Sequence, residues 1–160
     1  MDYLSFDNFL TTLAGTGTVT TFTGVGFGFV NGIAVDPADG IACTTTEIDF
    51  SVEFYDLAKR TGFRVTLPGA TNQIFSGADV EFDPVNHLFL VAQPVSSTAG
   101  SGSSIQVFDT KGNFVESING LNFSNASNVI PAHIALKPSN RTGFVDGSSS
   151  GVTEIQSFTY

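Results

Sequence analysis

Two carboxylates and an imidazole are the residues of this chain best suited to bind a metal ion. Asp79 and Glu81 lie two positions apart in an apolar run, so both side chains would lie on the same face of a β-strand. His133 occupies the position that matches Asp79 in a later segment of similar sequence. Carboxylate oxygens and imidazole nitrogens are ligands of divalent cations. These three residues are therefore the candidate metal or ligand-binding set, with hydrogen-bonded polar residues as the alternative, and no catalytic residue is assigned.

The segments that carry these residues are copies of one pattern. An apolar run ends in Asp-Pro or Lys-Pro and is followed by a turn and a second apolar run, at Gly32–Pro37, Asp79–Pro84 and His133–Pro138. Two copies continue to a third run that ends in an aromatic residue and Asp, at Val52–Asp56 and Ile105–Asp109. A recurring unit of about 50 residues indicates stacked structural modules.

Within each unit, short apolar runs separated by Pro, Gly, Asp and Asn predict strands joined by tight turns. The Asp residues that recur at strand ends are expected to accept backbone hydrogen bonds in these turns. The predicted strands span 32–36, 40–46, 51–56 and 63–67 in the first unit, 78–83, 87–92, 104–109 and 113–118 in the second, and 132–136, 143–146 and 153–159 in the third.

The repeats predict one domain of three units over residues 32–160, with approximate bounds of 32–70, 78–122 and 132–160. Residues 1–31 match no full unit and form an N-terminal segment. The third unit lacks a fourth strand, and Val19–Phe22 is a candidate for the strand that completes it.

Four-stranded units of this kind resemble the blades of a β-propeller, in particular those of the NHL, YVTN and SMP-30/gluconolactonase-like families. The segments that carry the resemblance are Gly32–Pro37, Val52–Gly62, Asp79–Pro84, Ile105–Gly112 and His133–Pro138. The fold class implied is all-β, with four-stranded antiparallel meanders. A closed propeller has about four blades or more, so about three blades make an incomplete or half-propeller.

The resemblance also implies a place for the candidate ligands. The first strand of each propeller blade lines the central channel, so Asp79, Glu81 and His133 would meet there from neighbouring blades. Lactonases similar to SMP-30 hold a metal with acidic and amide residues, which makes a divalent cation the cofactor to test. Two open apolar blade faces imply either a longer protein or self-association that completes a ring.

Composition limits the partners. Six Lys and Arg stand against 15 Asp and Glu, a formal net charge of −9, and too few cations are present to build a nucleic-acid-binding patch. No apolar run is long enough for a membrane-spanning helix. The single cysteine, Cys43, has no partner within the chain for a disulfide and is expected to be buried. The start of the sequence, Met1–Asp7, lacks the basic and apolar regions of a signal peptide.

Three further motifs carry weaker signals. Gly147–Gly151 satisfies G-x-S-x-G, but a turn between strands is not the strand-to-helix turn of a nucleophile elbow. Gly24–Gly28 is glycine-rich but no predicted helix follows it to bind phosphate. His87 follows a turn with no other metal ligand at metal-binding spacing, so a surface hydrogen bond is expected for it.

These observations favour a non-enzymatic propeller-type module that binds or scaffolds an unknown protein or small molecule. The alternatives are a metal-dependent lactonase or hydrolase that uses Asp79, Glu81 and His133, and a fragment without a function of its own. Because longer propellers of this type are often exported, the resemblance implies an extracellular or periplasmic address if the chain belongs to such a protein. The sequence itself assigns no compartment.

Overall fold

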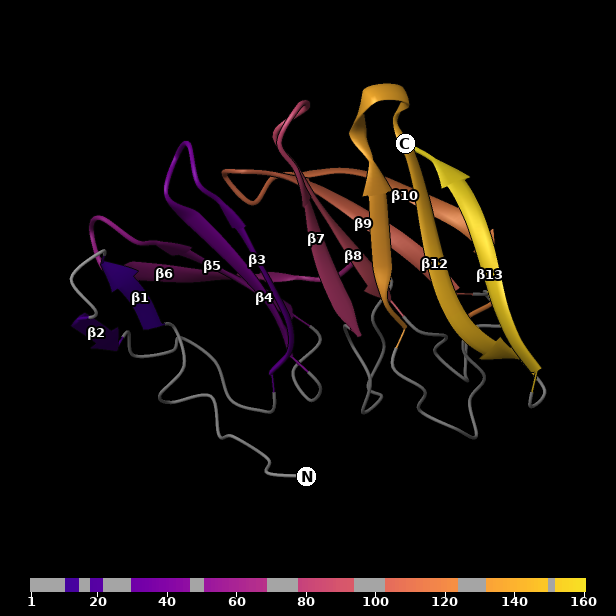
Figure 1. The fold of residues 1–160 in the computed structure, drawn as a ribbon, viewed down its shortest axis with the longest axis horizontal. Coiled ribbons are helices and arrows are strands. Elements are labelled where there is room, and N and C mark those ends of the chain that lie inside the picture. The colour runs from indigo at the N-terminus through magenta and orange to yellow at the C-terminus, as the bar shows by residue number, and fades with distance from the viewer. Residues whose placement is uncertain are drawn as a thin grey trace.

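The computed structural model describes residues 11–14, 18–21, 30–46, 51–68, 78–93, 103–123, 132–149 and 152–160. In these ranges the chain is built almost entirely of antiparallel β-strands, with one 3-10 turn at Pro138–Asn140 (Figure 1). The all-β fold class predicted from the repeats is confirmed. Within the described ranges, no helix is long and apolar enough to cross a membrane.

Each strand pairs with the next one along the chain, so every sheet is a meander. The first sheet contains β3 (Val30–Asp36), β4 (Ile41–Thr46), β5 (Ser51–Asp56) and β6 (Thr61–Thr66); the second contains β7 (Asp79–Asp83), β8 (Leu88–Gln93), β9 (Ser103–Asp109) and β10 (Phe114–Leu121); the third contains β11 (Ile134–Lys137), β12 (Thr142–Ser149) and β13 (Val152–Thr159). A separate hairpin joins β1 (Thr11–Ala14) to β2 (Thr18–Thr21).

The candidate closing strand lies in this hairpin. Most of Val19–Phe22 belongs to β2, which pairs with β1, and Phe22 falls outside the described residues. The part of the third sheet that the structure describes has three strands, and β2 is not one of them. Closing a short hairpin costs less chain entropy than pairing two strands from opposite ends of a domain, which favours the local partner.

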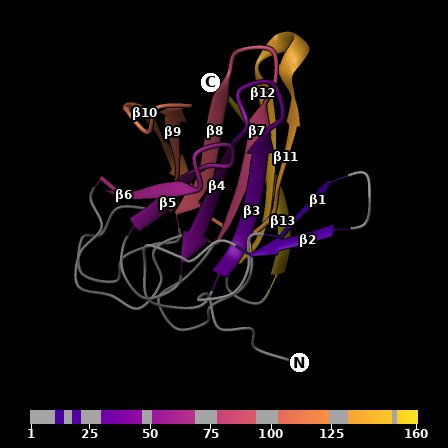
Figure 2. The same ribbon diagram turned by 90° about the vertical axis from the view of Figure 1, so that its left-hand side faces the viewer.

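The three large sheets pack face to face, with the second sheet between the first and the third, and we call this stack of sheets the fan. Their first strands, β3, β7 and β11, lie side by side, and β7 contacts both of its neighbours (Figure 1). Seen from the side, β6 and β10 lie far from this line of first strands (Figure 2). The turns β3–β4, β7–β8 and β11–β12 all lie at one end of the fan, the upper end in Figure 1.

The middle sheet is covered on both faces. Toward the first sheet, Val80, Val91, Phe89 and Phe108 pack against Phe54 and other apolar side chains of that sheet. Toward the third sheet, a second cluster joins the two sheets, and its buried members are Leu90, Ala92, Ile105, Val107, Leu121, Phe123, Ala132, Ile134, Val145, Phe158 and Tyr160. Because β8 contributes to both clusters, it reads as a nearly continuous apolar run in the sequence. β9 also contributes to both, but it buries the polar residues Ser103, Ser104 and Gln106 beside its apolar ones.

The Asp residues at strand ends accept the turn hydrogen bonds predicted for them. Asp36 Oδ1 accepts from the Ala38 N–H at 2.9 Å, and Asp83 Oδ1 accepts from the Val85 N–H at 2.7 Å. The equivalent bonds at the turns between third and fourth strands run from Lys59 N–H to Asp56 Oδ1 and from Lys111 N–H to Asp109 Oδ1, both at 2.8 Å. Each carboxylate satisfies backbone donors that the turn would otherwise leave unpaired.

Tyr160 fastens the third sheet to the second. Its backbone N–H donates to the Arg141 carbonyl at 3.1 Å, and its hydroxyl donates to Asp83 Oδ2 at 2.9 Å in a buried position. Burial raises the pKa of Asp83, but hydrogen bonds from Asn86, Tyr160 and Val85 outweigh it, so the pKa lies below its usual value. Burial, and after it the same hydrogen bond, raise the pKa of the Tyr160 hydroxyl.

We expect Tyr160→Phe to lower the free energy of unfolding at neutral pH by about 1–2 kcal/mol, because it removes a buried hydrogen bond to a charged group. A folded-state pKa below the unfolded value adds stability above the unfolded pKa of about 4, and this stability is lost as the pH falls through the folded value. The difference between wild type and Tyr160→Phe should therefore shrink in acid. Urea unfolding of both proteins at neutral pH and near pH 3 measures it, and equal differences at the two pH values would contradict the assignment.

Candidate functional site

The structure places Asp79 at the boundary between the second and third sheets. Asp79 begins β7 and is half-buried, and its Oδ2 accepts a hydrogen bond from the Ile134 N–H of β11 at 2.9 Å. Burial raises the pKa of Asp79, against hydrogen bonds from the Ile134 and Val80 N–H groups and the charge of His133. One oxygen of this carboxylate therefore serves to join two sheets.

Glu81 lies on the same face of β7 and is exposed to solvent. Partial desolvation raises the pKa of Glu81, and the negative charge of Asp79 raises it further. The carboxylates of Asp79 and Glu81 therefore repel one another.

His133 precedes β11 and is directed to Asp146 of β12. The His133 N–H donates to Asp146 Oδ1 at 2.7 Å, and the ring Nδ1 lies 3.2 Å from the same oxygen. The charges of His133 and Asp146 both act on Asp79, so the three side chains form one electrostatic group. Through the repeat alignment, the sequence anticipated that Asp79 and His133 occupy matching positions in neighbouring units, and the structure places Asp79 at the start of β7 and His133 just before β11. The sequence analysis missed Asp146. The metal role of Asp79, Glu81 and His133 stays a prediction.

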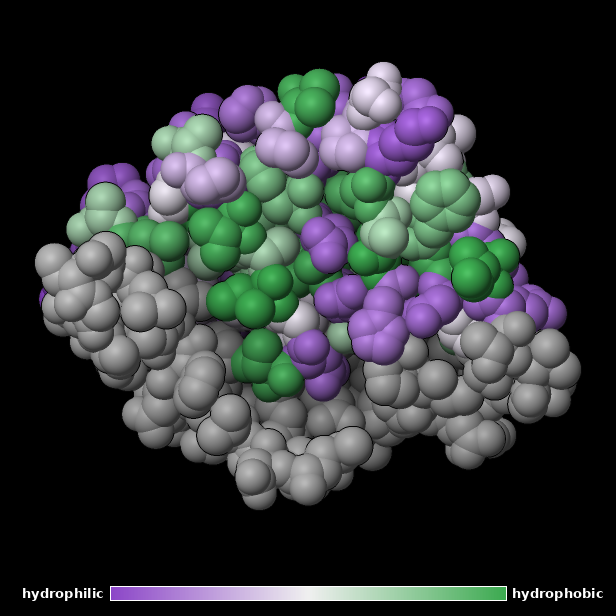
Figure 3. All heavy atoms as spheres, viewed as in Figure 1, coloured by the Kyte–Doolittle hydropathy of each residue, from purple (hydrophilic) through white to green (hydrophobic). Residues whose placement is uncertain are grey.

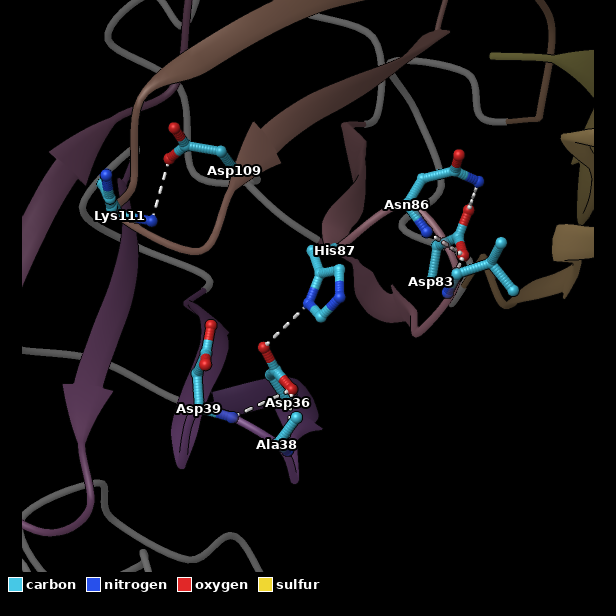
Figure 4. Close-up of polar contacts among 9 residues, drawn as sticks. Asp36, Ala38, Asp39, Asp83, Asn86, His87, Asp109 and Lys111 are labelled. Atoms are coloured by element: carbon cyan, nitrogen blue, oxygen red, sulfur yellow. Dashed lines mark hydrogen bonds and ion pairs between the residues drawn. The ribbon is translucent and has the colours of Figure 1, made fainter.

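A second group lies at the upper end of the fan, where the turns of the first two sheets meet. Asp36 ends β3, Asp39 lies in the turn that follows it, and His87 lies in the β7–β8 turn (Figure 4). Among the residues described, this is the group of three whose ligand atoms all lie within 4.8 Å of one another. His87 Nδ1 is 3.6 Å from Asp36 Oδ2.

The backbone of the turn directs His87 to the first sheet. His87 adopts a left-handed conformation with φ of 55°, as do Gly40 at 66° and Arg141 at 51° in the matching turns. All three residues immediately precede the second strand of their sheet. The left-handed conformation crowds the Cβ atom against the backbone, a strain that glycine avoids because it has no Cβ. His87 is therefore held in a conformation that glycine adopts more easily.

Sequence reasoning missed this pair and expected only a surface hydrogen bond for His87. Asp36 and His87 lie one repeat apart, and spacing along the chain gives no hint of contact. The alignment of the units on their prolines does place both residues in equivalent turns, which was the available signal.

The remaining motifs do not form catalytic sites in the described residues. Gly147 of the G-x-S-x-G motif lies in β12, and the strand β13 follows at Val152, where a nucleophile elbow would have a helix. Ser150 and Gly151 lie outside the described residues, as does the glycine-rich segment 24–28.

Comparison with solved structures shows the fold. A chain of the Kuenenia stuttgartiensis hydrazine synthase matches with a TM-score of 0.69 and 15% identity over 91% of this chain and 38% of its own length. A chain of a nidogen/laminin complex matches with a TM-score of 0.63 and 12% identity over 90% of this chain and 49% of its own length. Both are propeller-type structures. The fold is that of β-propeller blades.

The propeller likeness extends to architecture alone, since identities this low carry no function. The chain spans less than half the length of the two solved chains. No protein-family model matches the sequence, and comparison with curated proteins finds no relative.

Proposed function

We propose that this chain is a binding module of propeller type that recognises another β-sheet, supplied by a second copy of the chain. The observation that carries the proposal is the contrast between the sheets. Buried clusters cover both faces of β8 and β9 in the middle sheet, and the exposed large apolar side chains of its strands, Phe114 and Val115, lie on β10 at its edge. The first and third sheets expose large apolar side chains on β3, β12 and β13. The resemblance to NHL, YVTN and SMP-30-like repeats supports a binding role of this kind.

The open face of the third sheet has a defined apolar centre. Phe144 pairs with Ala135 across β11 and β12, and Ile155 lies diagonally beside them on β13. Ile155 is 75% exposed. Side chains that pair on one face of a sheet are stabilised when a second sheet covers them, and packed sheets lie about 10 Å apart.

The first sheet offers a face that could receive it. Gly32 and Ala34 of β3 face the second sheet, so the alternating Ile33 and Val35 point to the opposite side, where both are exposed. Farther along that side, Ala42 and Tyr55 are buried, so the exposed part of this face lies along β3. Apolar residues gather across the middle of the face seen in Figure 3, with polar residues among them and along much of its upper edge. Head-to-tail contact between a first sheet and a third sheet of different copies is a heterologous interface, which closes into a ring or continues as a chain.

Sedimentation velocity over a wide range of concentrations tests the proposal. We expect concentration-dependent association that strengthens with moderate salt, because salt screens the repulsion between copies of net charge −9. Ile155→Lys should weaken association about tenfold or more, since it buries a charge at the contact. Val85→Lys is the matched control, because Val85 is 64% exposed on a turn and the change in net charge is the same.

Mixing two variants identifies the geometry. Ile33→Lys and Ile155→Lys should each fail to associate alone, yet a mixture should form a heterodimer through the one interface that both changes leave intact. Monomeric wild type at all concentrations would overturn the proposal. Association that Ile33→Lys leaves unchanged would replace the head-to-tail contact with a symmetric one between third sheets.

A further inference from the structure

The carboxylate of Asp36 is buried with one oxygen lacking a hydrogen bond. Its Oδ1 accepts from the backbone N–H groups of Ala38 and Asp39 at 2.9 and 3.3 Å. Its Oδ2 has no hydrogen-bond partner, and the side chain is only 1% exposed. A buried carboxylate oxygen without a partner costs free energy, so its position calls for an explanation.

The unpartnered oxygen faces His87. The distance of 3.6 Å from Asp36 Oδ2 to His87 Nδ1 is too long for a hydrogen bond, and the imidazole approaches the carboxylate from the neighbouring turn in Figure 4. Two ligands of a tetrahedral zinc ion, each about 2.1 Å from the metal, are themselves about 3.4 Å apart. The observed separation is therefore close to that of two ligands of one ion.

Asp39 completes the set of three ligands. Its carboxylate lies in the same turn as Asp36, and one oxygen comes within 4.8 Å of both other ligand atoms. Asp39 is exposed and His87 is 53% exposed, so both side chains can adjust by rotation while the buried Asp36 stays fixed. A cation here would compensate the unpartnered oxygen of Asp36 and the negative charge of Asp39 together.

We propose that Asp36, Asp39 and His87 bind a divalent cation of the zinc class and so cross-link the turns of the first and second sheets. One imidazole nitrogen with two carboxylate oxygens suits zinc and related transition metals, whereas Ca²⁺ and Mg²⁺ prefer sites made of oxygens alone. Because the ligands come from two sheets, binding stabilises the packing of one sheet on the other. This site is separate from Asp79, Glu81 and His133.

The test is calorimetric titration of the purified full chain with Zn²⁺ at pH 7.5, together with thermal unfolding with and without Zn²⁺. We expect one tight site per chain and a rise of the melting temperature with Zn²⁺ concentration, because the ion binds the folded state. Binding should weaken in acid, since a histidine coordinates a metal only as the neutral imidazole. Mg²⁺ at the same concentration should give little effect.

Two variants remove ligands while keeping the turns. His87→Gly replaces a left-handed residue with the one that adopts this conformation most easily, and Asp36→Asn keeps an oxygen to accept the Ala38 and Asp39 N–H groups. Each should weaken zinc binding about tenfold or more and lower the rise in melting temperature at a given Zn²⁺ concentration.

The controls locate the site. Arg141→Gly also replaces a left-handed turn residue with glycine, in the matching turn of the third sheet. His133→Ala removes the only other histidine of the chain. Both should bind zinc as the wild type does. Absence of a tight site in the wild type would overturn the proposal, as would zinc binding that survives in His87→Gly and is lost in His133→Ala.

Discussion

Phe54→Ala is expected to lower the free energy of unfolding by about 3–5 kcal/mol, the range for removing a buried aromatic side chain from a packed core. Phe54 is fully buried between the first and second sheets. Its ring stacks on Phe63 with centroids 5.4 Å apart and meets Phe89 and Phe108 edge-on at 5.7 and 6.1 Å. Loss of the ring leaves a cavity at the centre of this cluster, because strands held by ladder hydrogen bonds cannot collapse into it.

Phe63→Ala is the matched control, since it makes the same change at the ring that stacks on Phe54, and this side chain is 45% exposed. We expect it to cost about 1 kcal/mol, because a half-exposed ring buries less area and leaves no closed cavity. Urea unfolding of the three proteins measures both differences. Equal losses for the two variants would show that the core does not lie where the two sheets meet.

The strands could be predicted from sequence because local chemistry determines them. The run from Gly32 to Val35 alternates between the two faces of β3, and Asp36-Pro37 ends it with a residue that accepts turn hydrogen bonds and one that fixes φ. The same chemistry recurs at Asp83-Pro84, so the strand and turn predicted for the first unit could also be predicted for the second. Stacking followed from the apolar faces that a single sheet leaves uncovered.

The polar groups could be predicted only in part, because their contacts cross from one sheet to another. Repeat alignment placed Asp79 and His133 in equivalent positions, but the bond from Ile134 N–H to Asp79 Oδ2 depends on how far β7 and β11 are offset. The approach of His87 to Asp36 depends in the same way on the angle between two sheets and on a left-handed turn residue. The hydrophobic pattern predicts neither quantity, because it specifies which face of a strand is buried and not how far one sheet is shifted or rotated relative to the next.

The alignment of the three repeats places Gly32 of the first unit at the position of Asp79 and His133. This equivalence is misleading, because the structure leaves no room for a side chain at Gly32. A Cβ atom built on Gly32 would lie 2.9 Å from both the Asp79 Cα and the Val80 N of β7. These are backbone atoms that cannot rotate away, so the first strands of the two sheets approach this closely only because the residue lacks a side chain.

Gly32→Val is therefore expected to lower the free energy of unfolding by about 3 kcal/mol, toward the upper end of the cost of overpacking, because β3 must move away from β7. Gly32→Ala should cost less, since one methyl group requires a smaller shift. Ala135→Val places the same valine side chain at an exposed position of β11 and should change stability by no more than about 0.5 kcal/mol. Urea unfolding ranks the three variants. A Gly32→Val protein as stable as Ala135→Val would mean that the first strands are farther apart, and that residues of any size can occupy the first position of each unit.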